Sequence, residues 1–586
     1  MTKRLFLLFL DGADYAFTRA AQDAGRLPNL TALARGGTVA PLATSFPAES
    51  PVAFAEVLTG CNPGKHGIFD FLHRDAATRM PAVSLFERTE AGFRNAIAAP
   101  TLCEPLARAG VRSALIRVPG AFPPPPGADL VVGGLGVPDA GGSWGLAQVF
   151  TRDGGAGDLF GTRERAWRRD GESLMLDIES PHGGIVTQRL RLAGGSWWWN
   201  TTELPFGRFG PWLAVDSPGG RGLAAAHVSG TIDDPVITLT PIWARFDDER
   251  LGAVHPHAWA RERASRTPPT PAAGWPEPNL LHARGRVSFE AFFDLASRCA
   301  ADFESMTFDV LADPSYDLVI ANHELFDRAA HAGFGDTADA QVSAALVGVL
   351  ERFDAFIGAV RAHFPDAEVW VASDHGFAPW RRRVNLNRWL YENGFLVAEI
   401  PDADPDLASL QGGVFWAGVD WSRTRAYAMG LSKIYLNLEG REPDGVVAPG
   451  KPARELTVEL MAKLGAWRDA ATGTPVIRRV LESRRLYWGQ ALGRAGDLVV
   501  CYEPGYRTDW VSSLGGLGTP ALADNDTHWR ADHCGVDPEL IPGILILPRA
   551  INTPNPCLRD LAPSILRHFG VTVDAPMDGR VLWSDE

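Results

Sequence analysis

The chain has 586 residues, which is too many for one compact core and enough for a large domain with an insertion. Apolar residues make up 46% and charged residues 22%, an ordinary globular composition. The net charge of −14 argues against a nucleic-acid polymer as partner, because a phosphate backbone is bound by stripes of Lys and Arg. A small anionic substrate stays possible, since bound metal ions would reverse the local field.

The cysteines and the N-terminal segment bear on the cellular compartment. Six cysteines are scattered along the chain without a CxxC pair, which favours a reduced, cytoplasmic setting. The apolar stretch near the N-terminus covers only residues 5–10 and ends in an Asp with no small-residue cleavage site, so we predict no signal peptide. Because no apolar run approaches the length that spans a bilayer, we expect no contact with a membrane.

Short apolar runs that end in polar or Gly residues alternate with helix-like segments along most of the chain. This alternation predicts an α/β fold with a mostly parallel sheet flanked by helices. The expected strands are residues 4–10, 113–118, 129–132, 317–320, 368–372 and 543–547, and the clearest expected helices are residues 27–34, 101–109 and 340–356. Such sheets bind ligands beyond the carboxyl ends of strands, where we expect Asp11 and Asp374.

Between residues 151 and 290 the composition shifts to Gly, Trp and β-branched residues, and a Pro-rich stretch at 267–278 closes this segment. We interpret 151–290 as a β-rich insertion that ends in a linker, with residues 1–150 and 291–586 forming the catalytic core. Three consecutive tryptophans at 197–199 could form a substrate platform, but packing in a core is the favoured interpretation.

The segment from Ser45 to Gly60 has the pattern of a helix that begins at a phosphate site. Ser50 followed by Pro51 predicts a helix N-cap with Pro at the first helical position, and Gly60 is expected to end the helix. An oxygen at a helix N-terminus lies where backbone N–H groups and the helix dipole favour an incoming phosphate. A purely structural Ser-Pro cap explains this pattern equally well.

Two further patterns offer carboxylates to a metal ion. Asp11-Gly12 follows the first expected strand, although for Asp11 alone a turn-capping role is the better interpretation. Asp327 and His331 are four residues apart, which places them on one face of a helix, where they could share a metal. A simple Asp–His ion pair is the commoner use of that spacing.

The remaining candidates lie in the C-terminal half. The segment Ser373-Asp374-His375-Gly376 directly follows an apolar strand. Adjacent Asp and His there favour a ligand site, because both side chains carry desolvation costs unless something binds them. His533 lies shortly before the last expected strand, with His528 as a nearby competitor.

Taken in chain order, these residues resemble the metal-ligand set of the alkaline phosphatase superfamily, and most closely its type I phosphodiesterase/nucleotide pyrophosphatase family. That family has the order Asp, a Ser or Thr nucleophile, Asp-x-x-x-His, Asp-His and His. The corresponding residues of this chain are Asp11, Ser50, Asp327, His331, Asp374, His375 and His533. Segments 62–68, 435–442 and 505–507 are also similar to family segments. The resemblance covers residues 1–150 and 300–586 and implies an alkaline-phosphatase-like core.

The resemblance implies two divalent metal ions and a serine nucleophile. Mixed carboxylate and imidazole ligands suit Zn²⁺ best, with Mn²⁺ allowed. One ion would be held by Asp327, His331 and His533, and the other by Asp11, Ser50, Asp374 and His375. Ser50, at the start of the helix that leads to a Thr-Gly pair, would attack phosphorus and form a phosphoseryl intermediate, with Ser45 as second choice. Lys65 and His66 could contact the phosphate.

Two departures from the family pattern bear on the substrate. Glu49 puts a carboxylate beside the nucleophile, which would repel phosphate unless it points away. The segment Phe69-Asp70-Phe71 stands where nucleotide pyrophosphatases keep an Asn that holds a phosphate oxygen, and this argues against nucleotide substrates. The x-Pro-Ser-Arg signature of sulfatases does not follow Ser50, so a sulfatase is not expected.

The leading hypothesis is a hydrolase that cleaves phosphodiester or pyrophosphate bonds in a small phosphorylated substrate. The alternative is a phosphomonoesterase or a phosphotransferase similar to cofactor-independent phosphoglycerate mutase, which would need an additional Arg or Lys near the phosphate. A non-catalytic binding protein on this fold is the third hypothesis, although the ligand set shows no decay. The sequence does not predict the oligomeric state.

Overall fold

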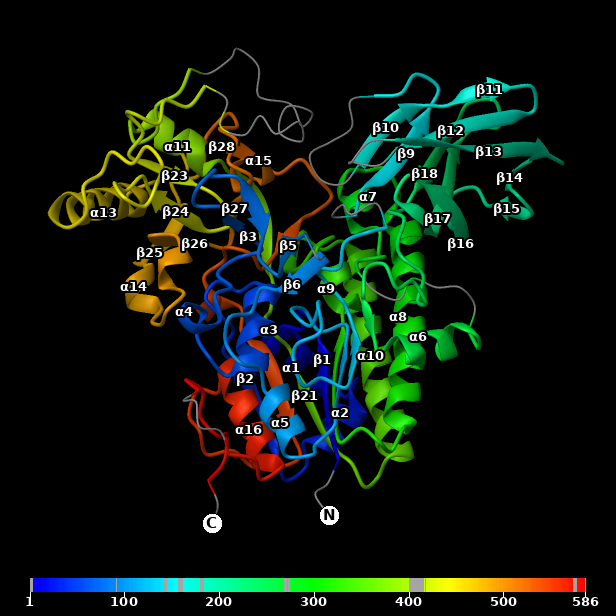
Figure 1. Ribbon diagram of the computed structural model, residues 1–586, viewed down its shortest axis with the longest axis horizontal. Helices are drawn as coiled ribbons and strands as arrows, with labels where there is room; N and C mark the ends of the chain where they lie inside the picture. The colour runs from blue at the N-terminus through cyan, green and yellow to red at the C-terminus, as the bar shows by residue number, and fades with distance from the viewer. Residues whose placement is uncertain are drawn as a thin grey trace.

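The computed structural model describes residues 4–90, 92–140, 145–155, 162–179, 184–267, 271, 274–399, 416, 418–572 and 577–584. An eight-stranded mixed sheet forms the centre of the molecule (Figure 1), in the order β19, β8, β7, β20, β1, β21, β30 and β2. In that order, the strand bounds are Val254–His255, Leu130–Val132, Ser113–Ile116, Leu318–His323, Leu5–Leu10, Glu368–Ala372, Gly543–Leu547 and Thr38–Leu42.

The strands from β8 to β21 run parallel, and the antiparallel strands lie toward the two edges of the sheet. All six strands expected from the apolar runs are present, but β30 pairs antiparallel with both β21 and β2. The sheet is therefore mixed rather than parallel throughout. Because β1, β20 and β21 are adjacent and parallel, their carboxyl ends meet at one edge. Helix α9 (Leu325–Ala330) follows β20 at the same edge.

Side chains of β1 alternate between two buried layers, as the pleat of a strand requires. Leu7 and Phe9 pack with helices α3, α5 and α16, whereas Phe6 and Leu8 pack with α2, α8 and α10 on the other face (Figure 1). These helices span Ser50–Thr59, Cys103–Arg108, Leu561–His568, Pro28–Leu33, Phe289–Ala312 and Ala340–His363. Helices thus cover both faces, which explains the continuous apolar runs of the central strands.

The segment expected to be a β-rich insertion contains most of two five-stranded sheets, at the upper right of Figure 1. One has the order β10, β9, β18, β17, β16, with bounds Thr162–Ala166, Ala147–Thr151, Pro235–Leu239, Gly220–Gly230 and Phe209–Ser217. The other runs β11 to β15, with bounds Arg168–Asp170, Ser173–Glu179, Ile185–Ala193, Ser196–Trp199 and Thr202–Leu204. Trp197 and Trp199 are buried in the apolar cluster that joins the two sheets, so they pack in a core.

A second lobe lies at the upper left of Figure 1 and has its own apolar core. Its antiparallel sheet has the order β23, β24, β26, β25, with bounds Ala426–Ala428, Lys433–Leu436, Leu498–Tyr502 and Ile477–Glu482. Strands β22, β27, β28 and β29 connect it to the main body, with bounds Ala378–Val384, Gly505–Thr508, Leu522–Asp524 and Ala531–Asp532. Helices α11 and α13 span Leu386–Glu392 and Lys451–Gly465.

The remaining features concern the compartment. Among the described residues, no helix combines the length and the apolar character needed to cross a membrane. All six cysteines fall within the described ranges and are free thiols. The cytoplasmic location stays a prediction.

Candidate active site

Asp11, Asp374 and His375 converge where β1 and β21 end, and we call them the first ligand group. All three side chains are buried, and their ligand atoms lie within 4.8 Å of one another. The chain turns sharply after Asp11, since Gly12 has a φ of 73° and a Cβ there would lie 2.5 Å from the Phe377 ring. Glycine at this position therefore lets the carboxylate approach its neighbours.

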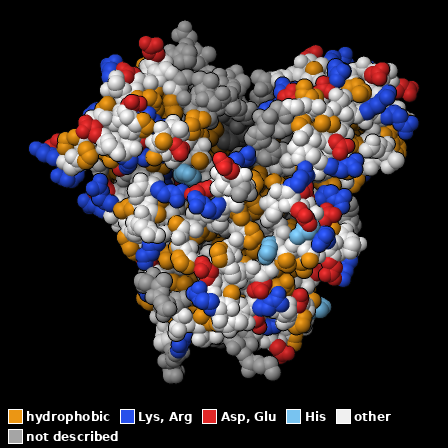
Figure 2. Space-filling model, viewed as in Figure 1, with side chains coloured by type: hydrophobic (Ala, Val, Ile, Leu, Met, Phe, Trp, Pro, Cys, Tyr) orange, Lys and Arg blue, Asp and Glu red, His pale blue; other side chains and the backbone are white. Residues whose placement is uncertain are grey.

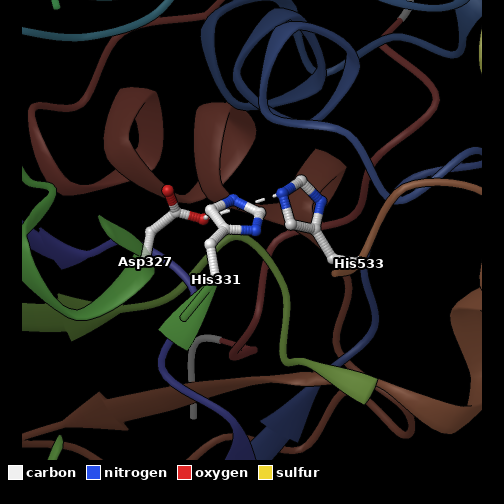
Figure 3. Close-up of side chains that lie close together, drawn as sticks. All are labelled: Asp327, His331 and His533. Carbon is white, nitrogen blue, oxygen red and sulfur yellow. Dashed lines mark ion pairs between the residues drawn. The ribbon is translucent and has the colours of Figure 1, made fainter. Parts of the chain in front are cut away.

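Asp327, His331 and His533 form the second ligand group (Figure 3). The spacing of four residues around α9 puts Asp327 and His331 on one face, as expected. Asp327 Oδ1 lies 3.4 Å from His331 Nε2 and 3.6 Å from His533 Nε2. The imidazole rings of His375 and His533 stack with their centroids 3.6 Å apart, so the two groups are in direct contact.

Ser50 lies beside the first ligand group, with its Oγ 3.2 Å from His375 Nε2. The competing Ser45 donates its hydroxyl hydrogen to the carbonyl of Pro47 at 2.6 Å. The structure therefore brings Ser50, but not the Ser45 hydroxyl, to the ligand groups. His528, the competitor of His533, packs 5.4 Å from the ring of His282.

The expected position of Ser50 as helix N-cap is wrong by one residue. Glu49 has extended backbone and its carbonyl accepts the N–H of Ala53, so Glu49 is the N-cap and Ser50 is the first residue of α3. A side-chain pattern does not reveal which carbonyl accepts the first helical bond. Gly60 ends the helix in the left-handed conformation, as predicted. The buried Glu49 carboxylate accepts the Phe71 N–H at 2.8 Å and does not line the cavity described below.

The carboxylates of both groups have one satisfied oxygen and one without a hydrogen-bond partner. The unsatisfied oxygens are Asp11 Oδ1, Asp327 Oδ1 and Asp374 Oδ2. The other oxygen of each carboxylate accepts one hydrogen bond. The donors are Asn322 Nδ2 for Asp11 (2.7 Å), Gly12 N for Asp374 (3.1 Å) and Arg328 Nη1 for Asp327 (2.9 Å). A buried polar atom without a partner costs about 1–3 kcal/mol. This arrangement fits bound cations.

Each histidine of the site is held through Nδ1 by a backbone carbonyl. The pairs are His331 with Ala531 (3.1 Å), His375 with Gly376 (3.2 Å) and His533 with Ala48 (2.7 Å). A carbonyl only accepts, so Nδ1 carries the proton and Nε2 offers its lone pair to the ligand group. Burial lowers the pKa of His375 to about 4 and that of His533 to about 3, so both rings are neutral at physiological pH.

The carboxylates of the two groups differ in their electrostatics. Burial, together with the charges of Asp374 and Asp327, raises the pKa of Asp11 well above its usual value. Burial also raises the pKa of Asp374 to about 6. For Asp327, burial acts in the same direction but is outweighed by His331 and Arg328, and its pKa lies well below the usual value. The first group thus accumulates repulsion that a cation would relieve.

A cavity of about 1090 Å³ opens between the β-rich insertion and the second lobe, where the face in Figure 2 is hollowed. Ser50, Asp327, His331 and His533 all line it. Lys65 does not, because it pairs with an aspartate elsewhere at 2.6 Å. His66, also a suggested phosphate contact, is fully buried outside the cavity lining.

Sequence reasoning assigned no role to Arg507 and Asp532, which line the same cavity. The Arg507 Nε lies 2.7 Å from Asp532 Oδ2, and the guanidinium lies 3.8 Å from the Trp510 ring centroid. Asp532 also accepts a hydrogen bond from Trp529 Nε1 at 2.8 Å. The only signal in the sequence was a Gly-Tyr-Arg segment similar to the family and an Asp directly before His533.

The family model described as type I phosphodiesterase / nucleotide pyrophosphatase matches residues 5–511. The chain belongs to this family. The match confirms the resemblance and supports a hydrolase of the phosphodiesterase or pyrophosphatase type. No curated protein matches the sequence.

Two solved structures illustrate what the chain is similar to. Phosphonoacetate hydrolase from Sinorhizobium meliloti 1021, in complex with phosphonoformate, is 15% identical over 96% of this chain and 94% of its own, with a TM-score of 0.46. Human ectonucleotide pyrophosphatase / phosphodiesterase 5 is 10% identical over 98% of this chain and 97% of its own, with a TM-score of 0.44.

Proposed function

We propose that the protein hydrolyses phosphodiester or pyrophosphate bonds in small phosphorylated substrates, with Ser50 as the nucleophile. The position of Ser50 carries the proposal: its Oγ lies at the N-terminus of α3, 3.2 Å from His375 Nε2. It shares one cavity with Asp327 and His533 of the second ligand group. The family supplies the reaction class, and the arrangement of side chains supports the choice of residue.

The donor set fits two divalent ions. The first ligand group with the Ser50 oxygen would hold one, and the second ligand group would hold the other. Mixed oxygen and imidazole nitrogen donors suit Zn²⁺, with Mn²⁺ allowed by ligand type. Two such ions, when bound, supply Lewis-acid charge that makes a serine hydroxyl a better nucleophile and neutralises developing charge on oxygen.

The residues of the chain then carry out two displacements. Ser50 Oγ gives up its proton and forms a bond to phosphorus as the bond from phosphorus to the leaving oxygen breaks, and the leaving oxygen takes up a proton. This gives a free alcohol or phosphate and a phosphoseryl intermediate, which in the case of a diester keeps the second substituent on phosphorus. Water from the cavity forms the second bond to phosphorus, the Ser50 Oγ–phosphorus bond breaks, and a proton returns to Ser50. The rings of His375 and His533, fixed by carbonyls and by stacking, keep their Nε2 atoms in place throughout.

The test is Ser50→Ala, with Ser45→Ala as the matched control. Turnover of bis(p-nitrophenyl) phosphate should fall by at least about 10³-fold in Ser50→Ala, because the attacking oxygen is gone. Ser45→Ala should retain turnover, and both variants should keep bound metal by elemental analysis. Undiminished turnover in Ser50→Ala would refute the nucleophile assignment.

Because Arg507 lines the cavity, phosphomonoesterase activity is the second candidate function. A monoester carries an additional negative charge, and Arg507 supplies a buried cation in the same cavity. Its charge is shared with Asp532 at 2.7 Å, which favours the diester. Faster cleavage of p-nitrophenyl phosphate than of the bis ester would move the function to the monoesterase.

A further inference from the structure

The cavity extends far beyond the two ligand groups. Its volume of about 1090 Å³ exceeds what a phosphoryl group fills. Small-molecule sites commonly measure about 300–1,000 Å³. Ser50 lines this cavity together with Arg163, which lies in β10, and with Leu146 just before β9. The substrate therefore has room for a large substituent between the nucleophile and the insertion.

The cavity wall beside the second ligand group is aromatic. Trp275, Leu280, Trp510 and Trp529 line the cavity and belong to one apolar cluster. The centroid of the Trp529 ring lies 4.0 Å from that of the His331 ring, so this apolar cluster directly contacts the second ligand group. The other three side chains are partly exposed in this cavity.

Two members of this wall lie at the end of the insertion, Trp275 in the Pro-rich stretch and Leu280 just after it. Trp275 Nε1 donates to Asn279 Oδ1 at 3.2 Å, and Asn279 Nδ2 donates to the Arg328 carbonyl at 3.0 Å. The Arg328 guanidinium lies 4.4 Å from the Trp275 ring centroid and pairs with Asp327. Leu280 lies one residue beyond Asn279, in helix α7 (Asn279–Ala283). The linker is thus fastened to the helix that carries Asp327.

The geometry of displacement fixes which substituent meets this wall. Ser50 contacts His375 of the first ligand group, so its oxygen attacks phosphorus from that side. In an in-line displacement the leaving oxygen departs on the opposite side. The second ligand group lies next to the first, with Trp529 against His331. The aromatic wall therefore adjoins the second ligand group, the side to which we assign the leaving oxygen.

We propose that Trp275, Leu280, Trp510 and Trp529 form a leaving-group subsite for an uncharged, planar aromatic alcohol. The inference rests on the proposed attack by Ser50 and names the substrate class for it. Indole rings stack favourably on other aromatic rings, and Leu280 adds apolar surface. The guanidinium groups next to the wall, Arg328 and Arg507, are ion-paired with acidic side chains, which favours an uncharged ring.

The first test compares 2-naphthyl and phenyl methyl phosphodiesters, whose leaving alcohols have similar acidity. Wild-type kcat/KM should favour the naphthyl ester about tenfold, because its second ring is buried against the wall. Leu280→Asp should reduce this preference to within about twofold. Leu540→Asp, at a Leu that is 37% exposed and outside the cavity lining, is the matched control and should keep the preference. If Leu280→Asp does not fold, Leu280→Ala should reduce the preference by about threefold.

The second test measures binding of 2-naphthol to metal-loaded protein by quenching of tryptophan fluorescence. Leu280→Asp should weaken binding about tenfold, and Leu540→Asp should not. If no ester is cleaved but 2-naphthol binds with this pattern, the proposed hydrolysis is wrong and the subsite stands. If the esters are cleaved without a naphthyl preference, or if Leu280→Asp binds 2-naphthol as the wild type does, the subsite is wrong.

Discussion

The two ligand groups use the same kinds of side chain but are stabilised in opposite ways. The first brings the carboxylates of Asp11 and Asp374 together in a buried position, and the pKa of each is raised. The second has one carboxylate, Asp327, between two imidazoles and beside Arg328, and its pKa is lowered. The first group is therefore destabilising without a cation, whereas the second is balanced by its own neighbours. Adjacent sites of similar composition can thus depend on metal to different degrees.

The largest expected effect comes from neutralising one carboxylate of the first group in the metal-free protein. Burial raises the folded-state pKa of Asp374 from 3.8 to about 6, so the folded chain binds this proton more tightly than the unfolded chain. The resulting stabilisation is present below the unfolded pKa and is lost as the pH rises through about 6. At about pH 8, Asp374→Asn should therefore be more stable than the wild type by on the order of 3 kcal/mol. Urea unfolding with a chelator present measures this.

The matched control is the same substitution in the second group. The folded-state pKa of Asp327 is depressed, so its charge stabilises the fold above the unfolded pKa and this contribution is lost as the pH falls. Asp327→Asn should therefore destabilise the metal-free protein at about pH 8. Shifts of the same sign in both variants would contradict the contrast between the groups.

The next effect concerns the outer partner of the first group. Asn322 Nδ2 donates a hydrogen bond to Asp11 Oδ2 at 2.7 Å. A leucine at position 322 has a similar volume but cannot donate this hydrogen bond. Outer partners of metal ligands commonly contribute about 10–100-fold to affinity, so Asn322→Leu should weaken one of two bound Zn²⁺ ions by that factor. Competition with a chromogenic chelator measures both affinities. Saturating Zn²⁺ should restore most of the turnover, and unchanged affinity for both ions would refute the role of Asn322.

The smallest expected effect on turnover comes from Lys65, which lies outside the site. Lys65 belongs to neither ligand group and pairs with Asp578 at 2.6 Å, outside the cavity lining. Lys65→Ala should change kcat/KM for bis(p-nitrophenyl) phosphate by less than about twofold, as expected for an ion pair near the surface. A tenfold loss would instead place this lysine against the phosphate.

The predicted site residues come together because local geometry and strand direction fix their positions. The spacing of Asp327 and His331 holds on any α-helix, and the segment Ser373-Asp374-His375 directly follows a buried strand. Parallel pairing of β1 with β21 then places Asp11 beside them. The role of each residue in catalysis stays a prediction. The direction of β30 could not be predicted, because an apolar run of five residues carries no information on which neighbour it pairs with.

The side chains that surround the ligand groups could not be predicted from the sequence, for a different reason. Arg507 and Asp532 pair across different segments of the chain, and Trp275 reaches α9 from the end of the insertion. These contacts follow no helical or strand period, and each depends on how separately formed units dock. The Pro-rich stretch predicted a linker but gave no sign that the linker lines the cavity.

The three imidazoles of the site rest on peptide carbonyls, and one of these belongs to Ala48, two residues before Ser50. A main-chain oxygen is present whatever side chain is encoded, so point mutation at such a position leaves the support of the ring intact unless the backbone moves. The cavity walls, by contrast, include side chains from the linker, the insertion and the second lobe. Substitutions in the cavity wall can therefore reshape the space around the site while the backbone support of the histidines is kept.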